Sequence, residues 1–96
     1  QNKKKFFKKN IFFINKNIFN YTFENENTVF CMFDPFGETS IINLLNKLCS
    51  ELKDNNVVII YFNPKHHSTI RSDYRFETLY NYKLINSKGF VVYKKL

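Results

Sequence analysis

The chain has 96 residues, of which 44% are hydrophobic, and its formal net charge is +7. This length allows one small domain with a single core. No apolar run approaches the ~18–20 residues that a membrane-spanning helix needs, so we expect a soluble, cytoplasmic protein without a membrane span. Cys31 and Cys49 form neither a C-x-x-C pair nor a disulfide-rich pattern, which favours reduced thiols.

Residues 1–10 are dominated by lysine around Phe6 and Phe7. We interpret them as a basic arm or the frayed end of a helix. Four apolar residues then run from Ile11 to Ile14 and precede a polar segment, which predicts a short buried strand that ends in a loop. Because the chain begins with Gln1 rather than Met, we expect it to be part of a longer protein.

The middle of the chain alternates between a strand and a helix. Thr28 to Phe33 is an uninterrupted apolar run, as found in parallel strands that are covered on both faces. Apolar residues then recur at helical spacing, and Thr39 or Ser40 could cap the start of this helix. These apolar residues are Ile41, Leu45, Leu48 and Leu52. Val57 to Phe62 is the clearest strand of the sequence.

The tail predicts a weak helical turn around Ser68 to Tyr74 and then an antiparallel hairpin. The two strands of this hairpin are expected at Phe76 to Leu84 and Gly89 to Lys94. The predicted order is therefore strand, strand, helix, strand, short helix, hairpin. This order indicates an α/β fold in a single domain.

Two of the predicted buried strands end in Asp-Pro and Asn-Pro, an amphipathic helix joins them, and a hairpin follows. This arrangement resembles the C-terminal half of class I, Rossmann-like methyltransferases that use S-adenosylmethionine. In that family the strand order is 3-2-1-4-5-7-6, and only strand seven is antiparallel. The resemblance runs from about residue 10 onward and implies a partial sheet with the equivalents of strands three to seven. In order, these are Ile11 to Ile14, Thr28 to Phe33, Val57 to Phe62, Phe76 to Leu84 and Gly89 to Lys94. The first of them would then lack its native neighbour, and would be loosely held or would pair aberrantly with the edge of the second.

The turn Asp34-Pro35-Phe36-Gly37 stands where the family has Asp or Asn, two prolines and an aromatic residue. The first two positions match, whereas Phe36 and Gly37 depart from the pattern. The resemblance implies that Asp34, Pro35 and Phe36 lie nearest the reaction, with Asp34 accepting a proton or a hydrogen bond from the methyl acceptor, whose class stays open. The alternative is a strand-ending turn without a catalytic role.

By the same resemblance, Asn17 falls where the family has an aspartate that contacts the adenine ring of the cofactor. Asn63 and Pro64, after the clearest strand, would line the substrate side, unless they form only a turn. The glycine-rich turn that holds most of the cofactor is absent, because Gly37 and Gly89 lie in other turns. We therefore expect the isolated chain to be inactive.

Two other functional classes remain open. The lysines with Phe6, Phe7, Phe12 and Phe13 could bind nucleic acid through phosphate contacts and base stacking, although the charge also fits biased codon usage. A non-catalytic interaction module is the other alternative. No metal site is expected, because the adjacent His66 and His67 lack further ligands at suitable spacing, and we expect both to be exposed loop residues.

Overall fold

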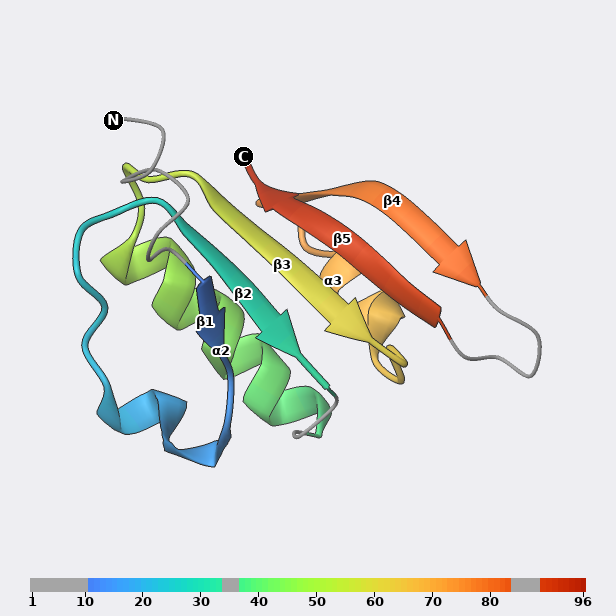
Figure 1. The fold of residues 1–96 in the computed structure, drawn as a ribbon, viewed down its shortest axis with the longest axis horizontal. Coiled ribbons are helices and arrows are strands. Elements are labelled where there is room, and N and C mark those ends of the chain that lie inside the picture. Colours follow the sequence, from blue (N-terminus) through green and yellow to red (C-terminus); the bar gives the residue numbers. More distant parts are fainter. Residues whose placement is uncertain (1–10, 34–36, 84–88) are drawn as a thin grey trace.

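The computed structural model describes residues 11–33, 37–83 and 89–96. In the described part, the strands form one mixed sheet, and helices cover one of its faces (Figure 1). In chain order the elements are β1 (Ile11–Phe13), the 3-10 helix η1 (Lys16–Asn20), β2 (Thr28–Met32), α2 (Glu38–Glu51), β3 (Val57–Phe62), α3 (His67–Arg71), β4 (Phe76–Lys83) and β5 (Gly89–Lys95). None of the helices in this part of the chain is long and apolar enough to cross a membrane.

The strand order is β1-β2-β3-β5-β4. The first three strands are parallel, and β5 is antiparallel to both β3 and β4. Helix α2 supplies the crossover that a parallel β2–β3 pair requires. The α/β class, the parallel pair and the position of β5 between β3 and β4 are therefore confirmed.

Strand β1 has a regular place in the sheet. It pairs with β2 in parallel, from Ile11 opposite Val29 to Phe13 opposite Cys31, and the backbone N–H of Ile14 donates to the carbonyl oxygen of Cys31 at 2.9 Å. Pairing with the edge of β2 is one of the two outcomes expected for this segment, and the other outcome, a loosely held segment, is not what the structure shows. In the family order the place beside strand four belongs to strand one, so the equivalence of β1 to strand three stays a prediction.

The core lies between the sheet and the two helices. Ile41, Leu44, Leu45 and Leu48 point from α2 into it and are fully buried, because they recur on one face of the helix. The N-cap residue of α2 is Gly37, which has no side chain that could cap the helix. The expected caps at Thr39 and Ser40 are wrong, because these residues already lie within the first helical turn.

The opposite face of the sheet is apolar but carries no helix in the described part of the chain. In β3, Val57, Ile59 and Tyr61 are buried beneath the helices, while Val58 and the other alternate residues turn toward the opposite face and stay partly exposed. Figure 1 shows this face toward the reader, with α2 and α3 behind the sheet. Parallel strands that are apolar on both faces are typical of sheets covered on both sides, whereas the described helices of this structure lie on one side only.

Candidate functional site

The carboxyl ends of β2 and β3 are where the sequence predicts a reaction site. Asp34, Pro35 and Phe36 lie outside the described residues, so the structure does not test their roles. Phe33, the residue before them, is 61% exposed, and its ring stacks on that of Phe62 with centroids 4.7 Å apart. The two strand ends are therefore joined by an aromatic contact beside the predicted site.

Asn63 ties the end of β3 to the start of β5. Its backbone N–H donates to the carbonyl oxygen of Gly89 at 2.7 Å, and its side-chain oxygen accepts from the N–H of Gly89 at 3.4 Å. Asn63 has a φ of 49°, which asparagine tolerates better than most residues. The structure thus gives Asn63 a structural role, whereas the substrate-side role predicted for Asn63 and Pro64 stays a prediction.

Asn17 lies in η1, beyond the carboxyl end of β1, and its side chain is exposed. Its backbone N–H donates to the side-chain oxygen of Asn15 at 2.9 Å, which caps the 3-10 helix. This capping explains why the expected loop after β1 is helical. The described contacts of Asn17 are local to the turn, so the adenine contact also stays a prediction.

The described residues do not fit S-adenosylmethionine by themselves. A cofactor cradle requires a glycine where a Cβ atom would collide with the ligand or with nearby backbone. A Cβ atom added at Gly37 would meet nothing within 4 Å, and Gly89 lies at the start of β5. Neither glycine follows β1, the strand that lies beside β2 in the described sheet.

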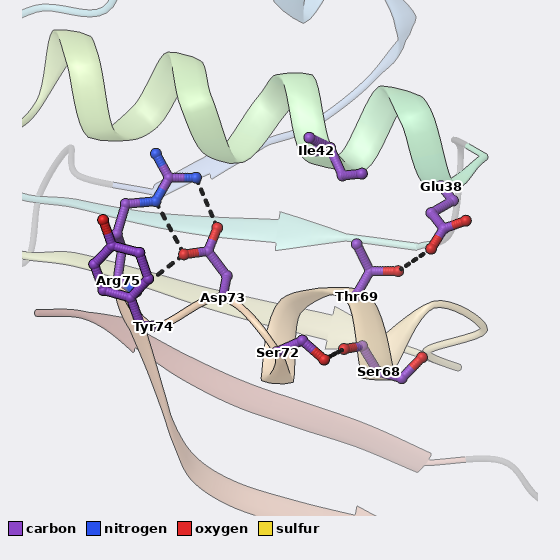
Figure 2. A pocket seen from close by; sticks show the side chains of 8 residues that line it. All are labelled: Glu38, Ile42, Ser68, Thr69, Ser72, Asp73, Tyr74 and Arg75. Atoms are coloured by element: carbon purple, nitrogen blue, oxygen red, sulfur yellow. Dashed lines mark hydrogen bonds and ion pairs between the residues drawn. The ribbon is translucent and has the colours of Figure 1, made fainter.

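A polar groove lies on the helical side of the molecule, between α2, α3 and the turn that follows α3 (Figure 2). Its volume is about 520 Å³. Its lining residues are Glu38, Ile42, Ser68, Thr69, Ser72, Asp73, Tyr74 and Arg75. Sequence reasoning missed this groove, because it forms only where residues from separate helices meet.

Asp73 and Arg75 form a charge pair at one end of this groove. The carboxylate of Asp73 accepts from Nε of Arg75 at 2.9 Å and from Nη2 at 2.7 Å, as Figure 2 shows. The hydrogen bonds from Arg75 hold the pKa of Asp73 below its usual value and outweigh burial, which acts in the opposite direction. The same pairing raises the pKa of Arg75. Arg75 also donates to the side-chain oxygen of Asn46 at 2.9 Å, which anchors the turn to α2.

The hydroxyl groups in the groove are engaged in hydrogen bonds with the protein itself. Thr69 Oγ1 donates to Glu38 Oε2 at 3.1 Å, and Ser72 Oγ donates to the carbonyl oxygen of Ser68 at 2.7 Å. The bond between Thr69 and Glu38 therefore links α3 to α2, and the bond between Ser72 and Ser68 lies at the end of α3.

The adjacent histidines are not exposed loop residues, so that expectation is wrong. His67 begins α3 and is partly buried, with Nδ1 2.6 Å from the hydroxyl oxygen of Tyr93. The backbone N–H of His66 donates to the hydroxyl oxygen of Tyr61 at 3.2 Å. Burial raises the pKa of Tyr93, so this hydroxyl stays protonated at neutral pH. Both histidines thus fasten α3 to the sheet.

No cluster of three potential metal ligands occurs among the residues that the structure describes. Cys31 and Cys49 are free thiols, as expected, and burial raises the pKa of both.

No family model matches this chain, and comparisons with curated proteins and with solved structures found no match either.

Proposed function

We propose that this chain is the carboxyl-terminal half of a Rossmann-like methyltransferase domain that uses S-adenosylmethionine. The observation that supports this proposal is the strand order β2-β3-β5-β4, in which β5 is antiparallel to its neighbours. This order matches the 4-5-7-6 part of the family's sheet, with strand seven as the antiparallel one. The helical connections also match, because α2 follows the equivalent of strand four and α3 the equivalent of strand five.

The order is informative because it is not the default for a chain with these elements. Consecutive strands are neighbours roughly two-thirds of the time, so β4 would be expected beside β3. Instead β5, the last strand, lies between β3 and β4, and Ile60 of β3 lies opposite Val92 of β5. A sheet that ends in this inserted hairpin is the family's distinguishing feature.

In this proposal the carboxyl edge of the parallel strands faces the substrate, as in other open α/β sheets. Asp34, Pro35 and Phe36 belong to that edge by sequence, and the exposed ring of Phe33 adjoins them. S-adenosylmethionine would supply the methyl group, and the residues that hold it would come mainly from another part of the parent protein. The 96-residue chain by itself should therefore neither bind the cofactor nor transfer a methyl group.

The experiment extends the coding sequence upstream and measures methyl transfer from radiolabelled S-adenosylmethionine by the longer product. A strand followed by a glycine-rich turn upstream, together with a labelled acceptor, would support the proposal. In that product Asp34→Asn should lower turnover more than cofactor affinity, while Asp54→Asn, on the exposed segment after α2, should change neither. An unrelated upstream sequence would overturn the proposal, and micromolar binding of S-adenosylmethionine to the 96-residue chain would contradict the assignment as a half-domain.

One observation favours the second candidate, a basic module that binds single-stranded nucleic acid. A stripe of rings crosses the open sheet face, each ring within 4.7–6.2 Å of a neighbour by centroid distance. The rings of this stripe belong to Phe33, Phe62, Phe90, Tyr80 and Tyr82. Exposed rings on a sheet can stack with bases, and the net charge of +7 would attract phosphates.

A further inference from the structure

The aromatic stripe is part of a wider apolar surface on the sheet face opposite the helices. The register places Phe62, Phe90 and Tyr82 opposite one another across β3, β5 and β4. Because side chains alternate along a strand, further apolar residues point to the same face. In the described strands these include Phe13, Val29, Val58, Ile60 and Val92. Figure 1 shows no described helix in front of this face.

The exposed part of this face is large for a domain of 96 residues. The rings of Phe13, Phe33, Tyr80 and Tyr82 are 41–64% exposed. An aromatic side chain covers ~150–250 Å², so these rings alone present roughly 300–550 Å². The partly exposed residues between them bring the face near the ~800 Å² per partner of a standard protein interface. A contiguous apolar patch of this size marks an interaction surface.

The face is also nearly free of charge. Among the side chains that the described strands place on it, the charged ones are Glu77 and Lys94, which lie opposite each other across β4 and β5. Opposite charges at this cross-strand spacing attract each other and leave the face without a net charge. The net charge of +7 is therefore carried elsewhere in the chain.

These features favour one occupant over another. A nucleic acid strand needs cations along the rings to contact its phosphates, whereas the lysine on this face already lies opposite a glutamate. A second copy of the chain needs no cation. In a twofold dimer both copies present the same patch, which must be complementary to itself, and an apolar face without net charge meets this condition.

From this face we infer that the chain forms a symmetric dimer in which two sheets pack face to face. Sheets in such a sandwich lie ~10 Å apart, and the side chains of their inner faces interdigitate to form a core. The helices of both copies then lie on the outside of the dimer. The inference does not depend on the proposed methyltransferase origin, because it uses only the exposed face of this chain.

The first test is sedimentation equilibrium of the 96-residue chain from low to high micromolar concentration, which should show a monomer–dimer equilibrium. Salt should not weaken the dimer, because it screens the repulsion between two copies of net charge +7. In a mixture of isotope-labelled and unlabelled chains, nuclear Overhauser effects between copies should join the ring of Tyr80 to methyl groups such as those of Val58 and Val92. A chain that stays monomeric, association that continues beyond the dimer, or contacts between copies that map to the helices would overturn the inference.

The second test places a charge on the face. Tyr80→Glu should raise the dissociation constant of the dimer about a hundredfold, because a loss of about tenfold for each ring occurs twice in a symmetric dimer. Phe33→Glu should act in the same direction, at a residue that follows β2 and is 61% exposed. Tyr74→Glu is the matched control, because Tyr74 is 87% exposed at the groove on the helical side. Circular dichroism would show that each variant is folded, and folded face variants that dimerise as well as the control would contradict the inference.

A third measurement separates the dimer from the nucleic-acid alternative. A single-stranded oligothymidylate is added to the ¹⁵N-labelled dimer at low salt. The amide shifts of β3 and β5 and the sedimentation of the dimer should stay unchanged. If the oligonucleotide instead displaces the second copy and shifts these amides, the face binds nucleic acid and the dimer inference fails.

Discussion

The charge pair between Asp73 and Arg75 provides a direct test of what holds the turn after α3. The substitution Asp73→Asn keeps the size of the side chain and an oxygen that can accept from the backbone N–H of Arg75, a bond of 2.9 Å. It removes the charge that the guanidinium of Arg75 pairs with. The side chain of Asp73 is only 13% exposed, so solvent screens this pair less than a pair on the open surface.

A hydrogen bond to a charged group contributes about 1.5–3 kcal/mol, and the guanidinium donates to this carboxylate through two nitrogen atoms. Because Arg75 is 32% exposed, we expect a value near the lower end, a loss of about 2 kcal/mol in the free energy of unfolding at neutral pH. For a domain of this size that loss corresponds to a decrease of about 8–16 °C in Tm. Thermal unfolding followed by circular dichroism would measure it.

The difference between Asp73→Asn and the native chain should depend on pH in a defined direction. Pairing lowers the pKa of Asp73 in the folded state below its unfolded value. The stabilisation is therefore fully present above about pH 4 and is lost as the pH falls through the folded pKa. Asp54→Asn, which removes the same charge from an exposed residue, is the control and should change Tm little. A difference that persists undiminished in strong acid, or an Asp73→Asn variant as stable as the control, would refute this reasoning.

Two further predictions concern the sheet. Hydrogen exchange should be slow throughout β3, because this strand is paired on both sides, and fast in β1, because this strand has three residues and pairs only with β2. Equal protection of both strands in a monomer would mean that the 96 residues form a complete domain. If the aromatic stripe binds single-stranded nucleic acid, the affinity should be weak and should fall steeply with salt, and Phe33→Ala should weaken it while Tyr74→Ala should not. A dissociation constant that stays level from low to high salt would instead indicate a specific site that does not depend on phosphate contacts.

The sequence alone predicted most elements of secondary structure, because burial within one strand or helix leaves a periodic pattern in neighbouring residues. The apolar run from Val57 to Phe62 coincides with β3, and the helical spacing of Ile41, Leu45 and Leu48 marks the buried face of α2. The resemblance to methyltransferases also predicted the inserted position of β5, which composition and periodicity do not contain. Asp34, Pro35 and Phe36 remain a prediction from sequence.

Only the tertiary structure decided which groups meet across the fold. Val29 lies opposite Ile11, and Tyr93 lies beside His67, although nothing in the local sequence distinguishes these partners. The contact between the rings of Phe12 and Tyr21 likewise depends on the path of the loop between η1 and β2, so a sequence pattern could not predict it. The physical reason is that the pattern of a segment records how deeply its side chains are buried, whereas the identity of the covering group depends on packing between segments that are distant in the chain.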